Sequence, residues 1–411
     1  MSVSRTAILA ATRSAWAALA LFAGSPASPA SPASSASPVP TPATRQGAEA
    51  AAGALSPVRA PGGSGSLVAS GATGAASIAL LDCASGRVLG QVRTPHPLAA
   101  PVVADFARGA LYAATRGADL LRYSIPELTP QARQPLAFEP TALAVSHGPD
   151  ALVLAGGRGQ APVSAHDPRT LEPLMRYPAS APSQVAAILD VAARGRFLVA
   201  FADLPELWEI AYDRDAPAVL RGLVHDYRMG EAVALPGRLT PRPFAVPSAT
   251  RELIAGATAF EVLRVDVDGV PGVVNLDVRR EIERPRLDAR PGARMTTDWS
   301  LGSRRGWLIA TTGSAARLLE APDWRVVTIE LGGTARALGH GSDRGRPLVV
   351  IEAATGTALL RIDATHARVQ DRTGLPAAAA TADRIVAGSD GQCAALLDRE
   401  GRWLGSFANA P

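Results

Sequence analysis

One short phrase recurs along this chain: an apolar run ends in Asp or a similar turn residue, Gly or Arg follows, and a second apolar run begins. Clear copies lie at residues 80–88, 165–171, 276–282, 362–369 and 397–403. The copies return at intervals of roughly 40 residues, a period typical of a β-propeller with one phrase in each blade. Because a propeller is a scaffold, we expect the chemistry of this chain in loops around the central channel.

The remaining sequence supports this interpretation. Short runs rich in Val, Leu, Ile and Ala alternate with turns containing Gly, Asp and Pro, and no segment has the periodicity of a long amphipathic helix. We therefore predict an all-β, eight-bladed propeller, with seven blades as the alternative. The predicted units are residues 67–97, 98–138, 139–182, 183–240, 241–290, 291–332, 333–375 and 376–411.

The N-terminus has the composition of a secretory signal. Arg5 and Arg13 provide a basic region, and residues 15–23 form an apolar run that is too short to span a bilayer. We predict a signal peptide over residues 1–36 and a periplasmic location, with an uncleaved anchor as the alternative. After cleavage we expect no membrane span.

The segment after the signal is dominated by Pro, Ala, Ser and Gly. Such a composition buries too little apolar surface to offset the entropy of ordering the chain. Residues 37–66 are therefore predicted to be a disordered linker, and residues 67–411 the propeller domain.

Composition excludes several classes of site. All 41 basic residues are Arg, so the chain has no lysine for a Schiff base or a phosphate-binding loop. The net charge of +4 and the absence of long arginine runs argue against a nucleic-acid partner. The chain has two Cys and no Cys-x-x-Cys-His motif, which excludes a c-type haem and a zinc or iron–sulfur site built on cysteines.

The two cysteines lie in the first and the last predicted unit. A propeller closes by placing these units next to each other, so Cys83 and Cys393 could approach. Export would permit a disulfide between them. We nevertheless expect two separate buried thiols, with the disulfide as the alternative, since sequence does not give the Cα separation.

One segment carries a resemblance to a known family. Residues 221–232 read RGLVHDYRMGEA, and they stand between the strand-like runs 207–213 and 273–280. In order and spacing this resembles the cytochrome d1 haem domain family, which includes the propeller half of periplasmic nitrite reductases and proteins of haem d1 biosynthesis. The resemblance covers residues 67–411 loosely and 139–290 best, as in a divergent member. It implies an eight-bladed propeller.

The resemblance also implies a tetrapyrrole, haem d1 or a related one, held over the central channel. His225 matches a distal histidine of the family, which ligates iron or donates a proton in catalysis. Arg228 and Arg221 would pair with carboxylates of the macrocycle, and Tyr227 lies between them in the same cofactor-binding segment.

The chain departs from the family pattern at two places. Arg290 occupies the position of a second distal histidine, and we assign it as a further carboxylate clamp. Pro101 occupies the position of the proximal histidine, and His96, five residues earlier, is the candidate proximal ligand and second metal-binding residue. The other four histidines are assigned structural roles: His147, His166, His340 and His366.

These features predict a periplasmic cytochrome d1-like propeller that binds a tetrapyrrole, in haem d1 maturation or in redox chemistry of the nitrite-reductase type in denitrification. It is an oxidoreductase only if the haem site is intact. Its partners would be periplasmic electron-transfer or haem-maturation proteins. The alternative is a non-catalytic propeller with a decayed haem site, acting as a binding or scaffold protein. A third class, the quinoprotein or lactonase-like propellers, would need a cluster of acidic metal ligands that this sequence does not provide.

Overall fold

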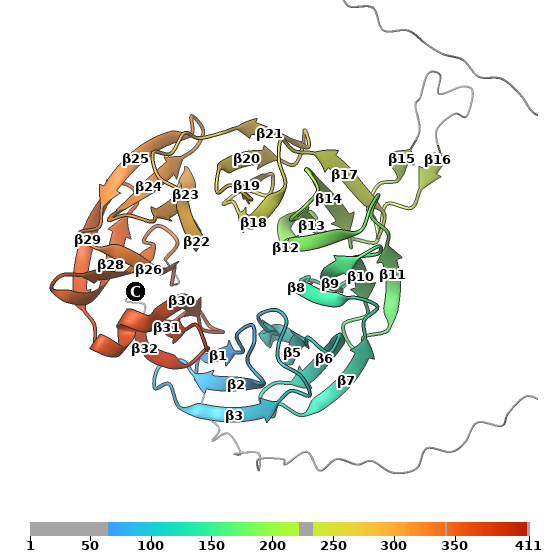
Figure 1. Cartoon of the computed structure of the whole chain (residues 1–411), viewed down its shortest axis with the longest axis horizontal. Helices are drawn as coiled ribbons and strands as arrows, with labels where there is room; N and C mark the ends of the chain where they lie inside the picture. The colour runs from blue at the N-terminus through green and yellow to red at the C-terminus, as the bar shows by residue number, and fades with distance from the viewer. Residues whose placement is uncertain (1–64, 222–232, 342, 409–411) are drawn as a thin grey trace, which may run out of the picture. The chain divides into compact units, whose positions relative to one another are not determined.

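The computed structural model describes residues 65–221, 233–341 and 343–408. The predicted signal peptide (1–36) and nearly all of the predicted linker (37–66) lie outside the described residues. Antiparallel sheets built from consecutive strands follow one another around a central opening (Figure 1). The predicted all-β propeller is therefore confirmed. Within the described ranges, no helix is long and apolar enough to cross a membrane.

In each sheet of the ring the strand that comes first in sequence lies innermost (Figure 1). The third and fourth sheets also pair with each other, through Ser183 with Gly159 and Gln184 with Arg158. The elements of this half of the ring are β1 (Leu67–Ser70), β2 (Ser77–Asp82), β3 (Val88–Arg93); β4 (Val103–Asp105), η1 (Phe106–Arg108), β5 (Ala110–Ala114), β6 (Asp119–Ser124), β7 (Pro130–Pro135); β8 (Glu139–Val145), β9 (Val153–Gly159), β10 (Val163–His166), β11 (Pro173–Tyr177); β12 (Ser183–Val191), η2 (Ala192–Arg194), β13 (Arg196–Phe201), β14 (Glu206–Ala211) and β17 (Pro241–Ala245).

The second half of the ring repeats this arrangement, and its last sheet lies beside the first. From β4 to β30 the first strands of successive sheets contact one another, so they line the central opening together. The elements are β18 (Thr250–Ala255), β19 (Glu261–Asp266), β20 (Pro271–Asn275), β21 (Arg280–Glu283); β22 (Pro291–Leu301), β23 (Arg304–Thr311), β24 (Ala315–Glu320), β25 (Arg325–Glu330); β26 (Thr334–Gly339), β27 (Leu348–Ala353), β28 (Gly356–Asp363), β29 (Arg368–Gly374); η4 (Ala377–Thr381), β30 (Ala382–Ala387), β31 (Cys393–Asp398) and β32 (Trp403–Ala408).

One predicted unit boundary is wrong. Strand β17 pairs with β14 and so completes the sheet that begins with β12, although the predicted boundary fell at residue 240. The reason is a two-stranded hairpin, β15 (Val219–Arg221) and β16 (Val233–Leu235), inserted between β14 and β17. The insertion delays the outermost strand beyond the regular repeat length.

The core lies between neighbouring sheets. On β13, Phe197, Val199 and Phe201 alternate with residues of the other face, and all three are fully buried. Phe201 packs edge-to-face on Trp208 with ring centroids 4.8 Å apart. Burial of each such side chain contributes about 1.5–3 kcal/mol, so sheet-to-sheet packing is the main source of stability.

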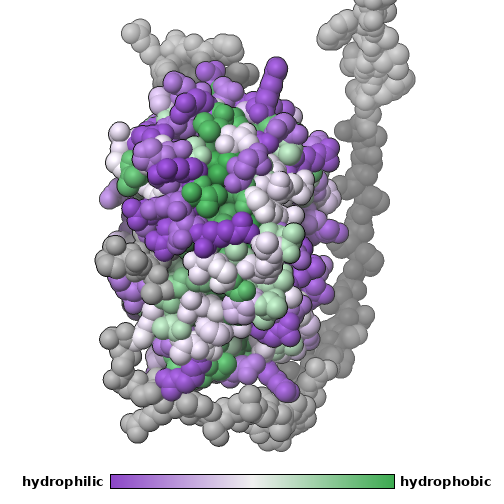
Figure 2. Space-filling view, turned by 90° about the vertical axis from the view of Figure 1, so that its left-hand side faces the viewer, coloured by the Kyte–Doolittle hydropathy of each residue, from purple (hydrophilic) through white to green (hydrophobic). Residues whose placement is uncertain are grey.

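Outermost strands face solvent and are correspondingly polar. Strand β29 reads RVQDRTG, with six of its seven residues exposed and one partly buried. Figure 2 views the ring from the side of β25 and β29, where hydrophilic side chains surround smaller hydrophobic areas. Strand β13 is buried because it lies inside its sheet, and β29 is solvated because it is the outermost strand of its sheet.

The ring is closed between its first and last sheets. Cys83, just after β2, forms a disulfide with Cys393 at the start of β31, with the sulfur atoms 2.02 Å and the Cα atoms 6.2 Å apart. The expectation of two separate thiols is therefore wrong, and the alternative, a disulfide, is confirmed. Leu67 and Ser389 add two hydrogen bonds: the Ser389 backbone N–H donates to the Leu67 carbonyl (2.9 Å), and the Leu67 N–H donates to the Ser389 hydroxyl (3.0 Å).

The two ends of the ring differ in the connections that they carry. We call the connector end the one where the outermost strand of each sheet joins the innermost strand of the next, as in residues 94–102 and 284–290. The opposite end carries the turn between the first and second strands of each sheet from β4 onward, such as 106–109 and 192–195. We call it the hairpin end, because the β15–β16 hairpin leaves from there.

Candidate functional site

The inner strands share an irregularity near the connector end. In β8, β12, β18, β26 and β30 the pairing with the second strand skips one residue, and in β22 it skips four. Such bulges bend a strand and re-aim side chains, and they are common next to functional sites. The skipped residues are Thr141, Ala186, Arg251, Arg336, Asp383 and the run Gly292–Met295, which contains Arg294.

Charged residues gather at these bulges. We define the channel cluster as Arg251 and Glu252 of β18, Arg294 of β22, and Asp383 and Arg384 of β30. The Arg294 backbone N–H donates to Glu252 Oε2 at 3.4 Å, which ties two neighbouring inner strands together. The Arg384 Nε lies 3.7 Å from Asp383 Oδ2, beyond hydrogen-bonding distance. The cluster therefore contains three arginines and two acidic residues.

Two of these arginines have donors without partners. The Nε and Nη2 atoms of both Arg251 and Arg384 are buried and have no hydrogen-bond partner. A buried donor left unpaired costs about 1–3 kcal/mol, and more when the group is charged. Four such donors therefore belong to side chains of the inner strands β18 and β30.

The charges of the cluster residues shift one another's pKa values. Burial lowers the pKa of Arg384, and the charge of Arg294 lowers it further, with Asp383 and Asp398 opposing. Strands β22 and β30 are not neighbours, since the β26 sheet stands between them, so Arg294 acts on Arg384 across one intervening sheet. Burial also raises the pKa of Glu252, despite the N–H of Arg294 and the charges of Arg251 and Arg294.

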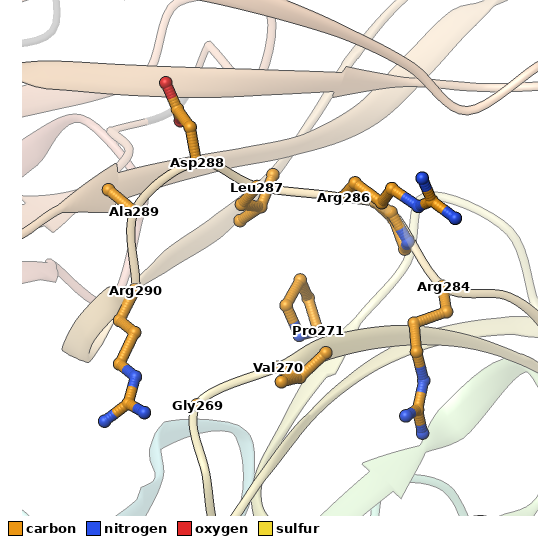
Figure 3. A pocket seen from close by; sticks show the side chains of 10 residues that line it. Gly269, Val270, Pro271, Arg284, Arg286, Leu287, Asp288, Ala289 and Arg290 are labelled. Carbon is orange, nitrogen blue, oxygen red and sulfur yellow. The ribbon is translucent and has the colours of Figure 1, made fainter.

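Arg290 lies at the same end of the ring but farther from the axis. It is exposed and lines a pocket of about 630 Å³ formed by Gly269–Pro271 and Arg284–Arg290. In Figure 3 Arg290 and Arg284 extend on either flank of Val270, whereas Asp288 points away. Asp288 accepts bonds from Arg317 at 2.8 and 2.6 Å.

His96 is also at the connector end and is exposed. Its ring lies over the β5–β6 turn, where a Cβ on Gly117 would come within 2.0 Å of His96 Cδ2. The Thr94 hydroxyl donates to the His96 carbonyl at 2.7 Å. The loop thus holds this imidazole over the second and third strands of its sheet. None of the described inner strands contains a histidine.

The segment with the family resemblance begins at the opposite end of the ring. Arg221 is the last residue of β15, and His225, Tyr227 and Arg228 lie outside the described residues. The base of the hairpin is tied to the outermost strand, since Arg242 of β17 donates to the carbonyls 217 and 218 at 2.7 and 3.1 Å. In Figure 1, β15 and β16 extend outward beyond β17.

Of the predicted site residues that the structure describes, His96 and Arg290 lie at the connector end, and Arg221 ends β15 at the hairpin end. Whether these residues form one site with His225, Tyr227 and Arg228 stays a prediction. Sequence reasoning missed the channel cluster. The available signal was a pair of adjacent charges at the start of an apolar run, as in Arg251–Glu252 before Leu-Ile-Ala and Asp383–Arg384 before Ile-Val-Ala.

Comparison with solved structures agrees with the fold. The chain is similar to the dihydro-heme d1 dehydrogenase NirN, solved in complex with DHE, with a TM-score of 0.66 and 16% identity over 86% of this chain and 77% of that one. It is also similar to the computationally designed protein Ika8, with a TM-score of 0.56 and 11% identity over 84% and 94%. No protein-family model matches the chain. No curated protein matches it in sequence.

Proposed function

We propose that this protein binds an acidic tetrapyrrole, haem d1 or a relative, at the connector end of its central channel. The observation that carries the proposal is the set of unpaired, buried guanidinium donors on Arg251 and Arg384. The fold likeness to NirN supports it, because that protein was solved in complex with DHE. In keeping with the sequence, the proposed location is the periplasm.

The channel cluster suits the rim of such a macrocycle. Arg251 and Arg384 stand on sheets separated by two others around the ring, with Arg294 between them. A tetrapyrrole carries carboxylates on several edges, so it can engage separated cations at once. Guanidinium groups pair with carboxylates through two parallel hydrogen bonds, which fixes orientation as well as affinity.

The described residues fit the acid groups of the cofactor better than its iron. In the described ranges no group of His, Cys, Asp and Glu is arranged to hold a metal ion. His96 is held over the β5–β6 turn, and the other proposed ligand, His225, lies outside the described residues. We therefore place binding, delivery or maturation of the macrocycle ahead of catalysis. When bound, the iron would supply the redox chemistry, and the arginines would hold and orient the macrocycle.

The alternative is a propeller with a decayed haem site that binds other proteins. The lack of a histidine on any described inner strand favours it. In that case the channel cluster would be a remnant without affinity for porphyrins.

The test is a spectroscopic titration of the exported protein with iron protoporphyrin and with metal-free protoporphyrin. We expect saturable binding of both, and a loss of affinity of about tenfold or more for both in Arg384→Gln or Arg251→Gln, since each removes a charged hydrogen bond worth about 1.5–3 kcal/mol. A matched control is Arg280→Gln, an exposed arginine on the outermost strand β21, which should leave both titrations unchanged.

The variant His225→Ala distinguishes ligation of the iron by His225 from binding of the macrocycle's carboxylates by the arginines. A histidine ligand would shift the Soret band of the iron form only, so His225→Ala should weaken that shift and leave the metal-free titration as it is. Absence of binding in the unaltered protein, for both porphyrins, would reject the proposal in favour of the decayed-site alternative.

A further inference from the structure

A second recess lies at the hairpin end of the ring, remote from the channel cluster. It has a volume of about 270 Å³, just below the range of about 300–1,000 Å³ that is usual for drug-sized ligands. Its walls come from two neighbouring sheets, those that begin with β4 and β8. The lining residues are Arg108, Tyr112, Arg122, Pro149, Ala151, Pro168 and Arg169.

Tyr112 and Arg122 form the inner wall of the recess. Tyr112 of β5 is 1% exposed, and its hydroxyl donates to the Pro168 carbonyl at 2.8 Å, which joins the two sheets. Arg122 of β6 lies against this hydroxyl. Burial raises the pKa of Tyr112, and the hydrogen bond from Arg122 opposes the rise. The Arg122 Nε is buried and has no partner.

The nearby acids pair with arginines other than Arg122. Asp105 pairs with Arg108, which also lines the recess, and Asp150 pairs with Arg214. The Oδ1 atom of Asp167 accepts from the backbone N–H groups of residues 169 and 170 at 2.8 and 2.9 Å. Within the described residues, Arg122 therefore forms no ion pair. The recess therefore contains the positive charge of Arg122, which no acidic side chain in the described ranges neutralises.

We propose that this recess binds a tetrahedral oxoanion, phosphate or sulfate, either free or as the phosphate group of a small ester. Two arginines that form no ion pair within the described residues reach it from different elements, Arg122 from β6 and Arg169 from the β10–β11 turn. Arg108 of η1 completes the lining, but it pairs with Asp105 and donates to the carbonyls of residues 146 and 148. A planar carboxylate is matched by one guanidinium fork, whereas a tetrahedral ion presents oxygens and up to two charges in several directions. The buried Arg122 Nε is the donor that such an ion would satisfy.

The experiment is calorimetric titration of the full chain with inorganic phosphate, sulfate, acetate and glycerol phosphate. We expect saturable binding of phosphate and sulfate at millimolar concentrations or below, and weaker binding of acetate. In Arg122→Gln the affinity should fall about tenfold or more, because a charge-assisted hydrogen bond is lost. Tighter binding of glycerol phosphate would assign the site to an ester, and tighter binding of inorganic phosphate to the free ion.

Two further variants keep the test decisive. If Arg122→Gln does not fold, Arg169→Gln on the exposed rim should show the same direction of effect. Arg384→Gln in the channel cluster should leave phosphate binding intact, so failure of this site and failure of the tetrapyrrole site give different results. Undiminished phosphate affinity in both Arg122→Gln and Arg169→Gln, or no saturable binding in the unaltered protein, would overturn the proposal.

Discussion

Several charged side chains of the inner strands are buried without enough partners, which lowers the free energy of unfolding. Arg251 and Arg384 keep buried donors without partners, and Glu252 is a carboxylate whose charged form is disfavoured by burial. Residues that only stabilised the fold would be better replaced by apolar ones of similar size. Their presence on inner strands therefore agrees with a binding role.

Glu252 allows a test of this cost through pH. Its pKa is raised in the folded protein, so the folded state holds the proton more tightly than the unfolded chain does. Stability then declines as pH rises from the unfolded to the folded pKa, and the penalty is complete above the folded value. We expect Glu252→Gln to raise the free energy of unfolding at about pH 7 and to change it less at about pH 4, near the ordinary pKa of a glutamate.

Urea unfolding of both proteins at the two pH values measures the difference. A Glu252→Gln variant that is less stable than the unaltered protein at neutral pH would show that the charge is stabilising, and would refute this assignment. The exposed Glu283 of β21 serves as a control, since Glu283→Gln should have little effect at either pH.

Six of the inner strands carry a bulge near the connector end. Three of these bulges coincide with the channel cluster, at Arg251, Asp383 and the run that contains Arg294. The second strands are mostly buried along their length, as in β19 and β31. In β23 the backbone of a neighbouring strand passes so close to Gly306 that a Cβ there would lie 1.8 Å from the Leu319 carbonyl oxygen.

We expect Gly306→Ala to destabilise the protein by about 2 kcal/mol or more, since the contact is with backbone inside a sheet and cannot be relieved by a side-chain rotation. The matched control is Gly374→Ala at the end of the exposed strand β29, where no atom lies within 4 Å of the added Cβ. Thermal unfolding followed by circular dichroism compares the two. Equal melting temperatures would contradict the packing described for β23 and β24.

The closed ring depends on the link between its first and last sheets. The disulfide between Cys83 and Cys393 spans 310 residues, and it stands in a small cluster with Val68, Leu81 and Ala395 from the first and last sheets. A cross-link that closes a long loop restricts the unfolded chain strongly. The last sheet is thereby fixed to the first at the seam of the ring.

We expect the double variant Cys83→Ser, Cys393→Ser to lose about 3–5 kcal/mol of unfolding free energy, and a reductant to lower the melting temperature of the unaltered protein. The reductant should leave the double variant unaffected, which is the internal control. Identical melting temperatures of the oxidised and reduced protein would show that the seam is held by packing and hydrogen bonds alone.

Sequence reasoning predicted the all-β propeller from the repeated phrase, because alternation along a strand and a turn after it are local properties. It placed every unit boundary close to a sheet boundary except the one at residue 240, where the β15–β16 insertion broke the period. It did not find the channel cluster, because Arg251, Arg294 and Arg384 are separated by more than 40 residues at each step and meet only once the ring is formed.

The sequence by itself determined which segments become strands and how often they recur, since both depend on contacts between residues that are close along the chain. Only the tertiary structure decided that Cys83 and Cys393 are bonded, that the inner strands bulge, and that Arg290 and Arg221 start from opposite ends of the ring. These features depend on the closure of the ring, which brings together residues that the sequence keeps far apart.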